Sequence, residues 1–264
     1  MSLSVITAAL RPDRELLIQA AKSLPLATSE PAQWIIVLDD AAPHDSEELQ
    51  KCMTETLEES LITPLVLGLP FWATAGGARS IGLAQVTTRW FCILDADDFF
   101  PAGSIDLQLD VLARHPEARW CIGAGSTLHG DGTTVWCPHN LPEKVPAGMV
   151  ARVTRDSGFL PTIPIAGIWD AELVRALGSW QALPRDEDTS LKLAATTAAP
   201  GVSTSKSTYV YRRDNPQQLS RASSYHQAGL WCRQAALART LALCVANPSL
   251  ADLHDGDWSA FLNG

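Results

Sequence analysis

The chain has 264 residues, of which 46% are hydrophobic and 19% are charged. This composition can build a sizeable core and excludes a disordered chain. The length fits one large domain or two small ones. Twenty Lys and Arg residues stand against 29 Asp and Glu residues, a formal net charge of -9. This acidic balance argues against nucleic-acid binding through phosphate contacts and against a polybasic membrane anchor.

The six cysteines contain no CxxC pair, so neither a zinc ribbon nor a redox pair is indicated. The N-terminus lacks a basic stretch followed by an apolar core, so we expect no secretory signal. The apolar segment 228–246 is interrupted by Arg233, Gln234 and Arg239, which favours a surface or interface helix over a membrane span. We therefore expect a cytoplasmic protein with reduced cysteines and no transmembrane segment.

Strand-like and helix-like patterns alternate through the first hundred residues. The expected strands are 3–9, 34–38, 63–69 and 90–94, and the expected helices are 14–24, 46–61 and 78–87. Residues 73–77, which include a Gly-Gly pair, are expected to form a loop. The alternation predicts an α/β fold with a mostly parallel sheet, in which a ligand lies beyond the carboxyl ends of the strands.

The pattern loosens after residue 100. The expected helices are 105–114, 173–177, 189–195 and 228–246, and the expected strands are 119–125 and 209–211. Residues 128–164 are rich in Gly, Pro and Thr and are expected to form a long functional loop. The helix over 228–246 carries more apolar positions than one narrow face needs. We expect it to pack on the domain and consider it a candidate homodimer contact.

An acidic cluster, Asp95-Ala96-Asp97-Asp98, follows the fourth expected strand. Because side chains alternate along a strand, Asp95 and Asp97 share one face and Asp98 falls at the turn. Clustered carboxylates suit Mg²⁺ or Mn²⁺, which also bind phosphate oxygens. The alternative interpretation is a solvated acidic turn that caps the next helix.

A second feature lies upstream of this cluster, where Gly76 and Gly77 precede Arg79. Paired glycines let the backbone approach a ligand closely, and an arginine on the first helical turn can meet an anionic or planar group. The alternative is an ordinary helix entry with a solvated arginine.

Residues 75–99 resemble the stretch G-x-A-x-A-R-N-x-G-x-x-x-A-x-G-x-x-x-x-x-L-D-x-D-D of family 2 glycosyltransferases, which have the GT-A fold. Residues 3–7 resemble the opening VSVIIPT, residues 34–45 resemble xIIVVDDGSxD, and residues 185–191 resemble ExxEDxxL. The resemblance implies a GT-A domain over residues 1–225. Its nucleotide-sugar-binding half would be 1–100 and its acceptor half 101–225, followed by a helical extension over 226–264.

This resemblance implies a metal-dependent, inverting glycosyltransferase that uses a nucleoside diphosphate sugar, with a UDP-sugar as the expected donor. Asp40 would bind the base, Thr7 would line the nucleotide pocket, and Arg79 would support the nucleotide. Asp97 would meet the ribose or sugar, and Asp98 would hold Mn²⁺ or Mg²⁺ at the diphosphate. The cation would stabilise the charge that develops on the leaving group.

On the acceptor side, the resemblance makes Asp188, with Glu187 beside it, the general base that takes the proton from an acceptor hydroxyl. A helix N-cap role for this acidic segment is compatible with catalysis. The acceptor would be a polysaccharide, a lipid-carrier precursor or a small natural product. Among the tryptophans near expected loops, Trp72, Trp136, Trp169 and Trp180, we take Trp169 as the best candidate for stacking on an acceptor.

Two departures from the family pattern bear on binding. Ala9 and Leu10 stand where an aromatic-Asn pair follows the first strand, so base stacking is expected to be weaker or supplied elsewhere. The segment from Tyr211 resembles the loop Y-R-x-H, but Asp214 replaces the histidine, which leaves a third metal ligand open; His226 is a candidate substitute. Arg212 and Arg213 are expected to clamp the diphosphate.

Two other functions stay in view. A sugar-1-phosphate nucleotidyltransferase would need a glycine-rich loop after the first strand, and residues 8–12 contain no glycine. A non-catalytic sugar-nucleotide-binding subunit would keep the sheet without turnover. The joint presence of Asp97, Asp98, Glu187 and Asp188 argues against that loss.

Overall fold

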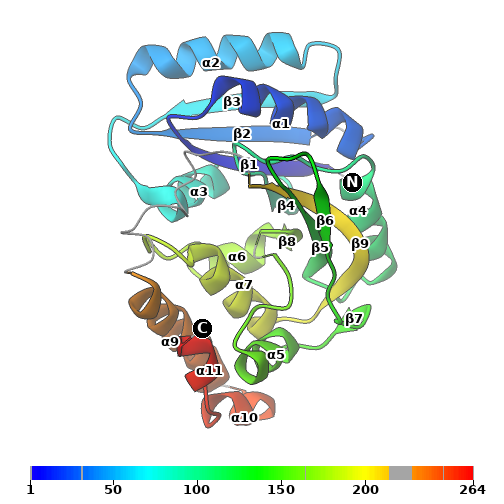
Figure 1. Ribbon diagram of the computed structural model, residues 1–264, viewed down its shortest axis with the longest axis vertical. Helices are drawn as coiled ribbons and strands as arrows, with labels where there is room; N and C mark the ends of the chain where they lie inside the picture. Colours follow the sequence, from blue (N-terminus) through cyan, green and yellow to red (C-terminus); the bar gives the residue numbers. More distant parts are fainter. Residues whose placement is uncertain (1, 31, 164, 214–227, 246, 264) are drawn as a thin grey trace.

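A computed structural model describes residues 2–30, 32–163, 165–213, 228–245 and 247–263 of the chain. Its centre is a nine-stranded mixed sheet in the order β3-β2-β1-β4-β8-β5-β9-β7, with β6 added beside β5 (Figure 1). Buried aliphatic and aromatic side chains from both halves of the chain join in one hydrophobic core. The predicted α/β class with a mostly parallel sheet flanked by helices is confirmed.

The first half of the chain alternates strand and helix as its sequence pattern predicts. The elements are β1 (Leu3–Leu10), α1 (Arg14–Ala27), β2 (Ala32–Asp39), α2 (Pro43–Thr56), β3 (Ile62–Gly68), α3 (Thr74–Ala84) and β4 (Trp90–Ile93). β1 pairs in parallel with both β2 and β4, and β2 pairs in parallel with β3. The expected loop over 73–77 is wrong, because α3 begins at Thr74 and takes the paired glycines into its first turns.

The second half turns the sheet into a mixed one. Its elements are α4 (Ser104–Arg114), β5 (Trp120–Leu128), β6 (Thr134–Cys137), β7 (Lys144–Val145), α5 (Met149–Ser157), β8 (Gly167–Asp170), α6 (Ala171–Ala176), α7 (Glu187–Ala198) and β9 (Gly201–Arg212). β8 runs antiparallel to β4 and β5, whereas β5 and β9 are parallel.

The long loop expected over 128–164 is a second correction. This stretch holds β6, β7 and α5, and the two strands are too short to give a periodic sequence signal. α5 is bounded by Gly148 and Gly158, both with φ of 79°, a left-handed conformation that glycine adopts without strain.

The helices cover both faces of the parallel strands. In α3, a Cβ on Gly82 would lie 2.7 Å from Ile6 Cγ2 and close to Val37 and Ile35, so this helix packs tightly on one face. Leu38, whose side chain alternates with that of Val37, lies with residues of α1 and α2 around a shared cavity. α3 and the α1–α2 pair therefore lie on opposite faces of the sheet.

The C-terminal segment is helical, with the 17-residue α9 (Gly229–Val245) followed by the short 3₁₀ helix η2 (Pro248–Leu250) and the short helices α10 (Ala251–His254) and α11 (Ser259–Asn263). α9 packs against α7, and α11 contacts α5 and α9. Figure 1 shows this group at the opposite end of the molecule from α1 and α2. Among the described residues, no helix has the length and hydropathy that crossing a membrane requires.

Candidate active site

Acidic residues from neighbouring strands meet at one edge of the sheet. β1 and β2 run in register so that Leu10 lies beside Asp39, and β4 lies on the other side of β1. Asp39 and Asp40 therefore emerge at the same carboxyl edge as Asp95, which follows β4. This is the edge where open α/β sheets bind their ligands.

Arg79 is at the centre of the acidic group at this edge. Its Nη2 donates to Asp95 Oδ1 at 2.7 Å, and its Nη1 donates to Glu187 Oε1 at 2.7 Å and to both carboxylate oxygens of Asp188 at 3.0 Å. The side chain is only 5% exposed. One guanidinium thus links the end of β4 to the first turn of α7, which is more than a hundred residues from Arg79 in the chain.

This arrangement corrects the expectation that Arg79 supports a nucleotide. Its guanidinium is buried against Asp95, Glu187 and Asp188, and its Nε is buried with no hydrogen-bond partner among the described residues. Although burial lowers the pKa of Arg79, the charges of Asp188, Asp95 and Glu187 raise it well above its ordinary value. Arg79 is a permanent cation that positions carboxylates.

The side chain of Asp188 is mostly buried but is partly exposed to solvent. Burial raises the pKa of its carboxyl to about 7; the Arg79 charge opposes this shift, and the nearby Glu187 and Asp95 add to it. Trp180 Nε1 also donates to Asp188 Oδ1 at 3.0 Å. The side chain keeps 16% of its surface exposed. A carboxyl that changes charge near neutral pH and is held from two sides is suited to general base catalysis.

The start of α7 places this carboxyl. Asp186 takes a left-handed conformation, with φ of 59°, and its carbonyl accepts from the Ser190 amide at 2.8 Å as the helix begins. The next two residues, Glu187 and Asp188, fall in the first turn, where the helix dipole stabilises negative charge. The predicted acidic helix start and the predicted catalytic pair are therefore the same structure.

The structure contradicts the assignment of Asp98 as a metal ligand. Its side chain is 1% exposed. Oδ1 accepts from the Arg212 amide at 2.7 Å and Oδ2 accepts from the Tyr209 hydroxyl at 2.7 Å. Burial, with the charges of Asp95 and Asp97, raises the pKa of Asp98 well above its ordinary value. Asp98 ties the turn after β4 to β9.

The expectation that Arg212 clamps the diphosphate is also wrong for its side chain. Its Nε donates to the Asp97 carbonyl at 2.8 Å and its Nη2 donates to Gln19 Oε1 at 2.7 Å, and the residue is buried. The next residue, Arg213, is exposed at the same strand end. Of the two arginines expected at the diphosphate, Arg213 is therefore the exposed one.

Thr7 is a further correction. It is fully buried, its hydroxyl donates to the Leu94 carbonyl at 2.6 Å, and it accepts from Trp34 Nε1 at 2.9 Å. A side chain engaged in this way inside the sheet does not line a nucleotide pocket. Thr7 instead holds β1, β2 and the end of β4 together.

The residues at this edge fit a divalent cation only in part. Among the described residues, no three or more His, Cys, Asp or Glu side chains form a group that could hold a metal ion. Mg²⁺ needs only one or two carboxylates when substrate phosphates and water complete its shell. Asp95 and Asp97 are both partly exposed and fit that requirement, whereas Asp98 does not. Asp214 and His226, the candidates for a third ligand, lie outside the described residues.

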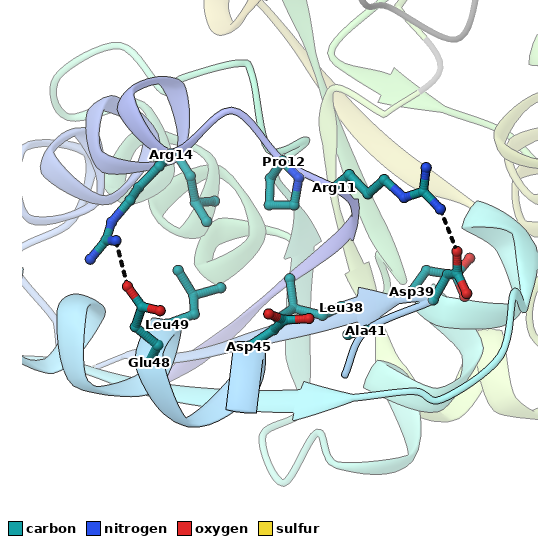
Figure 2. Close-up of a pocket in the computed structure, with 11 residues that line it drawn as sticks. Arg11, Pro12, Arg14, Leu38, Asp39, Ala41, Asp45, Glu48 and Leu49 are labelled. Atoms are coloured by element: carbon teal, nitrogen blue, oxygen red, sulfur yellow. Dashed lines mark hydrogen bonds and ion pairs between the residues drawn. The ribbon is translucent and has the colours of Figure 1, made fainter. Parts of the chain in front are cut away.

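Asp40 lies at the rim of a separate cavity of about 320 Å³ between α1, α2 and the end of β2 (Figure 2). Its carboxylate is 45% exposed and pairs with Arg11 at 2.8 Å. Both residues have positive φ, 45° for Arg11 and 54° for Asp40. Strained backbone of this kind is concentrated at functional sites. At the far end of the cavity, Arg14 pairs with Glu48 at 2.8 Å.

An aromatic loop lies directly beside Asp40. The Asp40 amide donates to the Phe71 carbonyl at 3.2 Å, and the Ala73 amide donates to Asp39 Oδ1 at 2.6 Å. Trp72, between these two anchored residues, is 65% exposed. In the sequence Trp72 is only one of several tryptophans near expected loops, because nothing in the local pattern shows that its loop is fixed to the end of β2.

Trp169, by contrast, is not an acceptor residue. It lies in β8, pairs with Phe91 and Trp120 of the neighbouring strands, and is buried in the core. Trp180 is also buried, but its indole N–H donates a hydrogen bond to Asp188 and so contacts the site. A buried tryptophan N–H usually finds a polar partner, but the sequence does not say which one.

The mostly parallel sheet flanked by helices is the GT-A fold, which the solved structures described below share. Residues 5–139, just over half of the chain, match the model of the family described as glycosyl transferase family 2. The chain therefore belongs to this family and is a glycosyltransferase, which confirms the resemblance seen in its motifs.

Solved structures show the same fold at low identity. Residues 1–349 of S. aureus TarS superpose with a TM-score of 0.69 at 14% identity, covering 100% of this chain and 71% of that one. The same TarS fragment in complex with UDP-GlcNAc gives a TM-score of 0.69 at 12% identity, covering 96% and 72%. A longer TarS structure is covered over 44% of its length. A comparison with curated proteins gave no match.

The buried position of Asp98 generates a stability prediction. Asp98→Ala removes the acceptor for two buried donors, Tyr209 Oη and the Arg212 amide, and should lower the free energy of unfolding by about 2–4 kcal/mol. Urea unfolding followed by circular dichroism measures the change. Asp98→Asn, which keeps one oxygen acceptor, is the matched control and should lose less. Equal stability of the alanine variant and the unsubstituted protein would show that the hydrogen bonds of Asp98 to Tyr209 and Arg212 do not stabilise the fold.

Proposed function

We propose that this glycosyltransferase moves a sugar from a nucleoside diphosphate sugar, with UDP as the nucleotide, to an acceptor hydroxyl with inversion. The observation that carries the proposal is the Asp188 carboxylate held by Arg79 and Trp180 at the edge of the sheet where strands β1, β2 and β4 end. Family membership supplies the reaction class. The choice of UDP is supported by the TarS structures with UDP-GlcNAc and UDP bound.

Asp188 is the general base in this proposal. Its carboxylate accepts the proton of the acceptor hydroxyl while that oxygen bonds to the anomeric carbon of the donor sugar. The bond between the anomeric carbon and the diphosphate oxygen breaks on the opposite side, and the nucleoside diphosphate leaves with the electron pair. One displacement of this kind inverts the anomeric centre. The proton then passes from Asp188 to solvent.

Arg79 and Glu187 act through Asp188. The permanent guanidinium charge limits the rise in the pKa of Asp188 that burial causes, so the carboxyl is ionised in a useful fraction near neutral pH. Glu187 Oε1 accepts from the same Nη1 and therefore helps to fix the guanidinium against the helix start. Both residues are positioning residues for the base.

The proposed binding site of the sugar-nucleotide donor lies at the ends of the neighbouring strands. Asp40, exposed at the end of β2, is the proposed partner of the nucleotide's uracil base, and Trp72 is an exposed aromatic side chain beside Asp40. Asp97, with Asp95, is the proposed holder of Mn²⁺ or Mg²⁺; when bound, the cation supplies charge stabilisation to the diphosphate. Of the two arginines expected at the diphosphate, Arg213 is the proposed cation for phosphate oxygens.

The Asp188→Asn variant tests whether Asp188 is the general base. Donor binding should be retained and turnover should fall by about 10³-fold or more, because the amide cannot accept the acceptor proton. UDP release from UDP-GlcNAc and other UDP-sugars, with an acceptor panel and Mn²⁺, measures turnover. Glu172→Gln, an exposed carboxyl in the first turn of α6, is the matched control. Near-normal turnover of Asp188→Asn would rule out the assignment.

The raised pKa of Asp188 predicts that the rate measured in the same assay depends on pH. Because only ionised Asp188 can act as the base and its pKa is raised to about 7, the rate should increase as pH rises from 6 to 8. A rate that is constant over this range would contradict a base with that pKa.

Metal and donor binding can be tested without an acceptor. UDP with Mn²⁺ at about a hundred times its dissociation constant should stabilise the protein by roughly 2.7 kcal/mol, visible as a thermal shift. Asp97→Asn should lose the Mn²⁺-dependent part of this shift. Asp98→Asn, the adjacent buried carboxyl, should keep it. The reverse order would restore Asp98 as the metal ligand and contradict the assignment made here.

A further inference from the structure

The indole N–H of Trp180 has a carboxylate as its hydrogen-bond partner. The residue is 5% exposed, and its Nε1 donates to Asp188 Oδ1 at 3.0 Å. A buried tryptophan N–H needs an acceptor, but a backbone carbonyl is sufficient. Trp120 in the core is an example, because its Nε1 donates to the Ala199 carbonyl at 2.9 Å. The bond of Trp180 to the proposed base therefore indicates a role in the site.

The Trp180 side chain is fixed by three other elements of the fold. Its ring makes an edge contact with Phe91 of β4, with the ring centroids 6.0 Å apart and the ring planes at 65°. The hydroxyl of the preceding residue, Ser179, donates to Ser80 Oγ of α3 at 3.0 Å. The Ser179 carbonyl accepts from Arg239 Nη2 of α9 at 2.7 Å. These contacts hold the indole in place independently of its bond to Asp188.

The hydrogen bonds distinguish the two oxygens of the Asp188 carboxylate. Oδ1 accepts from both Trp180 Nε1 and Arg79 Nη1, each at 3.0 Å. Among the described residues, Oδ2 accepts only from Arg79 Nη1, at 3.0 Å. Each carboxylate oxygen has about two acceptor positions, so both are occupied on Oδ1 and one stays open on Oδ2. The open position can take a proton from a further hydroxyl.

We propose that Trp180 is a positioning residue for the transfer reaction: its N–H occupies Oδ1 and orients the Asp188 carboxylate so that Oδ2 accepts the proton of the acceptor hydroxyl. The inference rests on Asp188 being the base of the proposed function. It adds the atom that takes the proton and the group that selects that atom. Arg79 Nη1 lies 3.0 Å from both oxygens and does not distinguish them.

The same bond favours ionised Asp188. A hydrogen bond donated to a carboxylate stabilises its charged form, so the Trp180 N–H lowers the pKa of Asp188 while burial, the largest effect, raises it. The charged groups around Asp188 lie on α3, after β4 and on α7, and they are Arg79, Asp95, Glu187 and Lys192. All of them remain in a Trp180 variant. Removal of the N–H should therefore raise the pKa of Asp188.

The first measurement follows the indole itself. In ¹⁵N-labelled protein, the Trp180 Nε1–H resonance is assigned by its absence in Trp180→Phe. It should shift between pH 5 and 9 with a midpoint of about 7, and should not do so in Asp188→Asn. The Trp120 resonance is the internal control and should not move, because its N–H is bonded to a backbone carbonyl. A constant Trp180 resonance over this range would overturn the proposal.

The second measurement is the kinetics of UDP release from UDP-GlcNAc or another UDP-sugar in the presence of Mn²⁺. In Trp180→Phe, kcat should be about 10-fold lower even on the high-pH plateau, because the carboxylate is no longer oriented. The pH of half-maximal activity should rise by about 1 unit, and KM for the donor should be unchanged. Trp120→Phe loses an equivalent buried N–H bond and should change none of these values.

A second variant keeps the kinetic test decisive. If Trp180→Phe does not fold, replacing Trp180 by benzothienylalanine keeps the ring shape and removes only the N–H group, and the same changes are expected. Equal kcat values and pH profiles in the Trp180 and Trp120 variants would overturn the proposal. If the unsubstituted protein releases no UDP from any UDP-sugar, the proposed function fails, and the indole titration still decides whether Trp180 binds the Asp188 carboxylate.

Discussion

A single buried guanidinium organises the candidate active site. Arg79 faces three carboxylates, Asp95, Glu187 and Asp188, which come from two distant parts of the chain. Burial raises the pKa of Asp188, and the charges of Glu187 and Asp95 add to this rise because one positive charge does not neutralise three negative ones. Removing one partner of a buried ion pair is costly because the remaining charges stay desolvated. Burial and the excess of negative charge together give the site a carboxyl that titrates near neutral pH.

The position of α3 makes this interaction possible. Gly82 lets the helix lie directly on β1 and β2, since a Cβ there would lie 2.7 Å from Ile6 Cγ2. Gly76, in the first turns, faces the Gln181 carbonyl and Glu187, and a Cβ would lie 2.6 Å from that carbonyl oxygen. The glycines therefore serve close packing of helix against sheet and against the segment before α7. They bring the Arg79 side chain between β4 and α7.

The sequence predicts the parts of this protein that depend on periodic burial. Strands β1 and β2 and helix α1 are apparent because their apolar positions recur at the spacing of buried strands and helices. The acidic motifs at residues 95–98 and 187–188 are apparent as well, since their order matches one family. Elements such as β7 are not, because a strand of two residues carries no period and is formed by pairing with β9.

Side-chain direction is what the sequence could not give. Asp97 and Asp98 are adjacent carboxylates in a turn, and only the contacts with Tyr209 and Arg212 show that Asp98 faces inward. The same holds for Arg212, whose guanidinium bonds Gln19 of a helix almost two hundred residues earlier. These outcomes depend on which distant element covers each strand end, and that information is not local.

The central claim is that Arg79 and Asp188 act as one unit, and a double-mutant cycle on the free energy of unfolding tests it most directly. The cycle compares Arg79→Gln, Asp188→Asn and the combined variant at pH 8, where both groups are charged in the unsubstituted protein. The account predicts strong non-additivity, with a coupling energy of about 1–3 kcal/mol. Single effects that add to within about 0.5 kcal/mol would contradict it.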